Sequence, residues 1–189
     1  MKKVILLFIV IAVMIVGIWT FLFGCGDTLP HNIADADDND LCLTLRVCID
    51  EYKIPEWNVP AEEDLSALSE EERTFYILSV FDMLFQCGGI SGYIMNTDGV
   101  YLEEIGPLLR TMNLEKMAQV YENYFQTCDI ELEDFLDDDA DLEVLTERYS
   151  TDAFDDAFSA CYEETDLTQI LADYARDHFV DEYQKRIHE

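Results

Sequence analysis

The sequence has 189 residues, enough for one domain with a hydrophobic core, and its 41 acidic and 11 basic residues give a net charge of −30. Half of the residues are hydrophobic, which excludes the composition typical of disordered chains. A charge of this size repels nucleic acid and anionic lipid headgroups, so we expect basic proteins or cations as partners and no direct contact with nucleic acid.

Residues 1–25 are predicted to be a membrane segment. Lys2 and Lys3 precede an uncharged run over residues 4–23, which as a helix would reach about 30 Å, the hydrocarbon thickness of a bilayer. Leu22-Phe23-Gly24-Cys25 resembles a bacterial lipoprotein box, which would make Cys25 the acylated residue. A cleaved lipoprotein signal and an uncleaved transmembrane anchor both remain open.

Both alternatives predict the same location. The lysines stay on the cytoplasmic side, so everything after Cys25 lies across the membrane, anchored in the bacterial cell envelope. The 41 acidic residues and nine of the basic ones follow Cys25, and the exported part therefore carries a net charge of −32.

Residues 26–40 are predicted to be an acidic spacer and residues 41–189 the folded domain. Asp35, Asp37 and Asn39 have the spacing of a calcium-binding EF-hand loop, but Asp40 and Arg46 stand where that loop needs glycine and glutamate. We therefore predict neither a metal nor another cofactor. The mixed apolar and polar pattern of residues 41–52 predicts a first helix, and two prolines then indicate irregular structure over residues 53–60.

The central stretch of the domain is residues 75–105. Ser69 and Glu72 form a capping box, which predicts the start of a helix. The helix should be mostly buried, because apolar residues surround one narrow polar stripe made of Glu72, Ser79, Asp82 and Gln86. We expect it to end at Gly88 in a left-handed conformation, and we expect Gly89 to permit a close backbone approach. An Asn-Thr-Asp-Gly turn at residues 96–99 leads into the next helix.

The segment Cys87-Gly88-Gly89-Ile90-Ser91-Gly92-Tyr93-Ile94-Met95-Asn96 resembles the signature of the DNA-mimic protein family, which reads roughly NNGGFxQYFxN. The resemblance covers residues 60–185, but Gln86-Cys87, Ile90 and Gly92 depart from the signature. It implies an all-helical acidic domain that occupies DNA-binding proteins. The residues that match the family, interpreted as a structural turn with its flanks, are Gly88, Gly89, Tyr93, Asn96, Ile105 and Gly106.

The rest of the chain also predicts helices. Pro107 should kink or restart the helix that contains Ile105, and Asn113 can cap the next one. Apolar residues at helical spacing indicate two more helices near Phe158 and Ile170, and no strand pattern of convincing length occurs. The predicted fold is all-α, a compact orthogonal bundle of about six or seven helices after a single N-terminal hydrophobic segment.

Catalytic patterns are lacking in the sequence. No serine or cysteine is recognisably paired with a base, and Cys87, Cys128 and Cys161 are expected to be small buried hydrophobic residues. We therefore predict a protein that is not an enzyme.

The densest acidic stretch, residues 131–141, is the candidate partner-binding site, with Phe135 or Leu136 as an apolar anchor between carboxylates. The alternative is a solvated loop whose aromatic ring packs inward. The candidate residues are Glu131, Glu133, Asp134, Phe135, Asp137, Asp138, Asp139 and Asp141.

The predicted function is that of a membrane-tethered acidic protein that engages basic proteins, either nucleic-acid-binding proteins or toxins. The alternative is a structural or cation-binding envelope lipoprotein without a mimic role.

Overall fold

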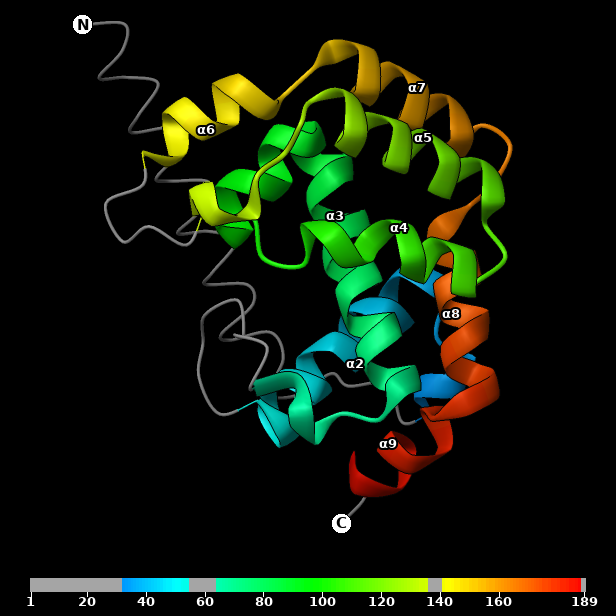
Figure 1. Ribbon diagram of the computed structural model, residues 1–189. Coiled ribbons are helices and arrows are strands. Elements are labelled where there is room, and N and C mark those ends of the chain that lie inside the picture. Colours follow the sequence, from blue (N-terminus) through cyan, green and yellow to red (C-terminus); the bar gives the residue numbers. More distant parts are fainter. Residues whose placement is uncertain (1–31, 55–63, 136–140, 188–189) are drawn as a thin grey trace, which may run out of the picture.

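The structure, a computed structural model, describes residues 32–54, 64–135 and 141–187. The predicted membrane segment and Cys25 lie outside these residues. The described residues form helices and no strands, which confirms the all-α prediction, and they contain eight α-helices. These helices (Figure 1) are α2 (Asp38–Lys53), α3 (Glu70–Thr97), α4 (Leu102–Thr111), α5 (Glu115–Thr127), α6 (Leu142–Tyr149), α7 (Asp152–Tyr162), α8 (Leu167–His178) and α9 (Val180–Ile187).

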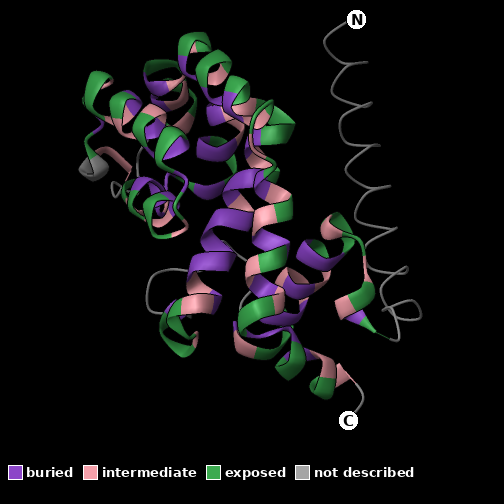
Figure 2. Cartoon of the chain, turned by 90° about the vertical axis from the view of Figure 1, so that its right-hand side faces the viewer, coloured by how far each residue is buried: buried purple, intermediate pink, exposed green. Residues whose placement is uncertain are grey.

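The long helix α3 is the axis of the domain. It runs through the middle of the molecule, with α2, α8 and α9 around its first half, α6 and α7 around its second half and α4 across its middle (Figure 1). Buried residues cover α3 along most of its length (Figure 2). Among the described residues, α3 is the one helix long and apolar enough to cross a membrane, with a mean hydropathy of 1.3, but half of that stretch is buried inside the domain. Such a composition is also typical of a core helix.

The predicted capping box starts α3. The Ser69 hydroxyl accepts a hydrogen bond from the Glu72 amide at 3.2 Å, and the Glu72 carboxylate accepts one from the Ser69 amide at 2.8 Å. Glu72 is only 1% exposed, and it also accepts hydrogen bonds from the Lys53 ammonium at 2.6 Å and the Tyr183 hydroxyl at 2.8 Å. One buried carboxylate therefore joins α2, α3 and α9.

An aromatic cluster forms the core around the middle of α3. The Phe81 ring lies edge-on to the rings of Tyr93, Tyr121 and Phe158, at centroid distances of 5.4, 5.7 and 5.4 Å. These separations and angles are the ones that favour aromatic pairs. Because Tyr121 belongs to α5 and Phe158 to α7, the cluster holds both helices in the core with α3.

The packed part of the chain begins within the predicted spacer. Ile33, in a short 3-10 helix (Ile33–Asp35), is fully buried, and its amide donates a hydrogen bond to the Gln184 side chain at 2.6 Å. The helix α2 starts at Asp38, three residues before the expected position, and the Asp37 side chain caps it. Residues 32–40 therefore pack on the domain.

The segment after α3 differs from the sequence prediction at two residues. The helix α4 does not restart at Pro107 but continues through it to Thr111. Asn113 is not the cap of α5, because it has a left-handed φ of 61° and Leu114 is the N-cap residue. Asparagine tolerates this conformation better than most residues, so its role here is in the turn between two helices.

Candidate functional site

The glycine pair of the signature forms a bend in α3. Gly88 has a φ of −158°, whereas Gly89 has a φ of 63° and a ψ of −160°, so the positive φ falls on Gly89 and not on Gly88 as expected. The non-helical φ and ψ angles of both glycines interrupt the helix here as expected, but a second helical segment of α3 begins directly at Ile90 and continues to Thr97. The conformation of Gly89 is open almost only to glycine, which explains why the bend occurs at this residue.

Asp155 of α7 fills the space that Gly89 leaves. A Cβ atom on Gly89 would lie 2.2 Å from Asp155 Oδ2, and Asp155 Oδ1 accepts a hydrogen bond from the Ile90 amide at 3.0 Å. Asp155 thus acts as an N-cap that one helix supplies to another. Burial raises the pKa of Asp155, the bond from Ile90 lowers it, and the carboxylates of Asp152 and Asp156 raise it.

Tyr93 and Asn96 support the helix after the bend. Tyr93 is fully buried, and its hydroxyl donates a hydrogen bond to the Val100 carbonyl at 2.6 Å across the turn that follows α3. Burial raises the pKa of Tyr93, so its hydroxyl remains protonated as a donor. Asn96 is exposed, and its amide donates a hydrogen bond to the Gly92 carbonyl at 2.7 Å. These contacts are those of a structural turn.

Ile105 and Gly106 serve the packing of α4. Ile105 is fully buried, and a Cβ atom on Gly106 would lie 3.1 Å from Glu122 Cγ on α5. Glu122 also accepts hydrogen bonds from the Arg110 guanidinium at 2.7 and 2.6 Å. Those two bonds lower the pKa of Glu122, although slight desolvation opposes them. The absence of a Cβ atom at position 106 therefore lets α4 lie close to α5.

Two consecutive helices carry the exposed negative charge that we call the α6–α7 ridge. They follow one another along one side of the molecule (Figure 1). Spacings of four and seven residues put Asp152, Asp156 and Glu163 on one face at α7. None of the ridge carboxylates forms an ion pair within the described residues. The ridge consists of the exposed residues Asp141, Glu143, Glu147, Asp152, Asp156 and Glu163.

A family model described as DMP19-like protein matches residues 66–178, which is more than half of the chain and reaches from just before α3 to the end of α8. The chain belongs to the DMP19-like protein family. This result confirms the resemblance seen in the signature and supports an acidic protein of the DNA-mimic type. No curated protein and no solved structure matches the chain.

The predicted binding stretch lies partly outside the described residues, which leave out Leu136, Asp137, Asp138 and Asp139 and the side chain of Glu133. Glu131 is exposed, and its amide lies 3.5 Å from the Tyr149 hydroxyl. Asp141 is exposed and caps α6 by accepting hydrogen bonds from the next residues' amides at 3.1 and 3.3 Å. Of the predicted residues, Asp141 is the one that joins the ridge as defined above.

Phe135 and Asp134 face the domain. The Phe135 ring lies 5.6 Å from the Tyr149 ring, and a Cβ atom on Gly99 would lie 2.5 Å from Phe135 Cδ1, so the ring covers the turn after α3. Asp134 accepts hydrogen bonds from the Arg148 guanidinium and the Tyr149 hydroxyl, both at 2.7 Å. These contacts agree with the alternative in which the aromatic ring packs inward.

The domain also has an open cleft of about 530 Å³ between α2, α3, α7 and α8. Behind it lies Asp82, which is 5% exposed and accepts hydrogen bonds from Tyr162 at 2.6 Å, Thr168 at 2.7 Å and Gln86 at 2.9 Å. Burial and the Asp82 charge raise the pKa of the Tyr162 hydroxyl. The cleft is lined by Asp37, Asp38, Asn39, Gln86, Tyr162, Asp166 and Thr168.

Most basic side chains form ion pairs within the domain. Seven of the nine that follow Cys25 form ion pairs with carboxylates, whereas 41 acidic residues follow Cys25. The surface charge is therefore dominated by carboxylates that no basic side chain balances. The seven are Lys53, Arg73, Arg110, Lys116, Arg148, Arg176 and Arg186.

The cysteines do not all lie in the core. Cys161 is buried as expected and Cys128 is half-buried, but Cys87 is exposed because it sits on the last turn before the bend, on the side away from the core. Among residues 32–54, 64–135 and 141–187, no group of histidine, cysteine and carboxylate side chains is arranged to hold a metal ion.

Sequence reasoning missed Asp155 and the α7 part of the ridge. The spacing of Asp152, Asp155 and Asp156 could have indicated an acidic helix face. Nothing local could have indicated the contact between Asp155 and Ile90, because 65 residues separate them.

Proposed function

We propose that this chain is a non-enzymatic binding protein that engages a basic protein through the α6–α7 ridge while a membrane segment holds it in the cell envelope. The observation that carries the proposal is the row of exposed carboxylates without ion pairs. The helices α6 and α7 have 8 and 11 residues, together about 29 Å of helix. One DNA strand carries about eight phosphates over that length, so the six carboxylates of the ridge have a similar charge density.

The exposed carboxylates of the ridge are better suited to binding a partner than to catalysis. Contacts within the domain shift the pKa of carboxylates outside the ridge, among them Glu72, Glu122 and Asp155. The ridge carboxylates face solvent, where they attract a cationic partner over a distance of about 10 Å at 0.1 M salt. Association should therefore be fast and should weaken steeply as salt is added.

The test compares two charge-matched double variants of the full-length protein in zwitterionic nanodiscs. Asp152→Asn with Asp156→Asn removes two ridge charges, and Asp177→Asn with Asp181→Asn removes two exposed charges at the same spacing near the start of α9. Proteins captured from solubilised membranes at low salt are quantified by mass spectrometry. We expect the ridge variant to reduce capture about tenfold and the control to retain it.

Duplex DNA serves as the competitor in the same capture experiment. If the ridge occupies the DNA-binding surface of its partner, added duplex should release the captured protein from the wild-type chain. Equal capture by both double variants, or a captured protein that duplex DNA fails to release, contradicts the proposal.

The membrane tether is tested separately. If Cys25 is acylated, Cys25→Ser should leave an uncleaved precursor of higher mass and abolish labelling by a fatty-acid analogue. If the segment is an uncleaved anchor, the two proteins should differ in mass only by the exchange of sulfur for oxygen, and neither should be labelled. In both cases protease added outside the inner membrane should digest the domain, and full protection in intact spheroplasts would overturn the proposed topology.

A further inference from the structure

We infer that Met95 and Val144 form an apolar anchor point at the α6 end of the ridge, where the basic partner inserts an apolar side chain that is flanked by lysine or arginine. This inference rests on the proposed function and adds the chemistry of the docking segment. Met95 is 49% exposed and Val144 56% exposed, the two largest values among the exposed large hydrophobic side chains of the described residues.

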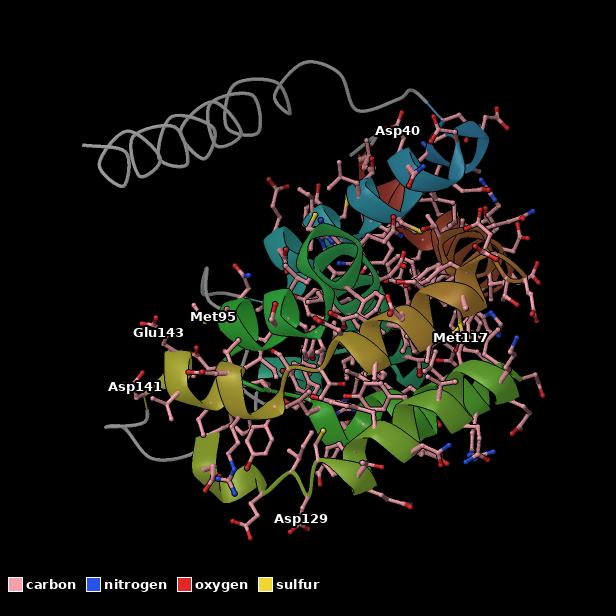
Figure 3. All side chains as sticks on the ribbon, turned by 90° about the horizontal axis from the view of Figure 1, so that it is seen from above. Asp40, Met95, Met117, Asp129, Asp141 and Glu143 are labelled. Atoms are coloured by element: carbon pink, nitrogen blue, oxygen red, sulfur yellow. The ribbon has the colours of Figure 1, made fainter. Side chains whose placement is uncertain are left out.

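The two residues come from neighbouring elements. Met95 lies on the last turns of α3 and Val144 on the first turn of α6, and these two helices pack against each other. Figure 1 shows α6 beside the end of α3, and Figure 3 shows Met95 on the same side of the molecule as Asp141 and Glu143. The rings of Phe135 and Tyr149 pack on each other, and Phe135 covers Gly99 in the turn after α3.

Negative charge surrounds this apolar point. Asp98 is exposed at the end of α3, and the ridge residues Asp141, Glu143 and Glu147 are exposed on α6. The basic residue of α6, Arg148, is held by Asp134 at 2.7 Å and lies over the Tyr149 ring at 5.0 Å. The surface therefore complements an apolar side chain between cations.

An apolar contact supplies binding specificity, which charge alone cannot. Exposed carboxylates attract many cationic chains, whereas a central apolar contact surrounded by charge distinguishes partners that carry the matching side chain. A second copy of this chain would bring its own carboxylates against the same surface, and an anionic membrane would be repelled as well. Charge complementarity therefore favours a basic amphipathic segment as the occupant.

The experiment uses two synthetic probes of equal charge, an oligolysine and a helix-forming peptide of lysine and leucine. Their binding to the full-length protein in zwitterionic nanodiscs is measured by fluorescence anisotropy, with empty nanodiscs as the blank. We expect the wild type to bind the lysine–leucine peptide about tenfold more tightly than oligolysine. Met95→Gln with Val144→Thr should abolish this preference and leave oligolysine binding unchanged.

Two control variants keep the interpretation unambiguous. Met83→Gln changes another exposed methionine of α3, 38% exposed on the other side of the bend, and should preserve the preference. Met95→Leu with Val144→Ile keeps the apolar contact and should also preserve it. All these residues are exposed, so the melting temperatures should agree, and they are checked by circular dichroism.

The outcomes separate the two proposals. If both peptides bind equally to the wild type, the anchor is wrong and the ridge remains. If neither binds, the proposed function fails and the anchor fails with it. If the wild-type chain self-associates and Met95→Gln with Val144→Thr abolishes this, or if the nanodisc lipid competes for the surface, the occupant is a second copy or a membrane and the inference is overturned.

Discussion

At the scale of single residues, the two adjacent glycines of the bend differ in whether a side chain could replace them. Gly89 has a φ of 63°, and the space a Cβ would need there already holds the Asp155 carboxylate. Gly88 has a negative φ, and a Cβ at that position would meet nothing within 4 Å. The signature contains both glycines, but only the second one is required by the conformation of the backbone and by a neighbouring atom.

We therefore expect Gly89→Ala to lower the free energy of unfolding by about 1–3 kcal/mol, because it strains the backbone and displaces Asp155 from the Ile90 amide. Gly88→Ala is the matched control and should change it by less than about 0.5 kcal/mol. Urea unfolding followed by circular dichroism measures both. Similar losses from the two variants would show that the bend does not depend on the conformation of Gly89.

A second prediction at this scale concerns pH and Glu72. Burial acts to raise the pKa of Glu72, but hydrogen bonds from Lys53, Ser69 and Tyr183 outweigh burial, and the pKa is lowered. A carboxyl with a lowered folded-state pKa stabilises the fold above its unfolded value of about 4.3, and this stability is lost as the pH falls through the folded value. Glu72→Gln should therefore cost about 2–3 kcal/mol at neutral pH and progressively less in acid.

The measurement for Glu72 is urea unfolding of wild type and variant over a series of pH values. Glu70→Gln is the control, since Glu70 is exposed on the same first turn of α3. A difference between wild type and Glu72→Gln that stays constant from neutral to acidic pH would show that the charge of Glu72 is not what stabilises the contact with Lys53.

At the scale of elements, the second half of α3 depends on α7 for its first hydrogen bond. Replacing Asp155 with alanine removes an N-cap and should cost about 1 kcal/mol. The loss should be local, so hydrogen exchange should become faster at residues 90–96 and remain unchanged in the first half of α3. Asp155→Asn keeps an acceptor oxygen and should behave almost like wild type. Faster exchange along the whole helix would mean that Asp155 supports the core instead of the bend.

Local rules explain which elements could be predicted. The capping box of Ser69 and Glu72 lies within four residues, so the start of α3 follows from the sequence. The turn at Gly88 and Gly89 was also recognisable, but the choice between a helix end and a bend depends on Asp155, which is distant in sequence. The polar stripe on α3 was seen as a pattern, whereas its burial depends on partners such as Tyr183 and Tyr162.

At the scale of the whole molecule, carboxylates outnumber basic residues by 41 to 11, so repulsion among them should oppose folding. Salt screens this repulsion within about 3 Å at 1 M. We therefore expect the melting temperature to rise as sodium chloride is increased from about 0.01 M to about 1 M, measured by calorimetry. Choline chloride should have the same effect if screening is the cause. A melting temperature that falls with salt would show that the ion pairs outweigh the repulsion.

The buried carboxylates of α3 also set an order of events during synthesis. Glu72 binds Tyr183, which lies 111 residues later in the chain, and Asp82 binds Tyr162 and Thr168, which lie 80 and 86 residues later. While the ribosome makes α3, these later partners do not yet exist, and of the partners of Glu72 only Lys53 and Ser69 have been made. We therefore expect the core to close only after nearly all of the chain has emerged. If the chain is exported as proposed, we expect these contacts to form only after it has crossed the membrane, because a chain without them is still unfolded.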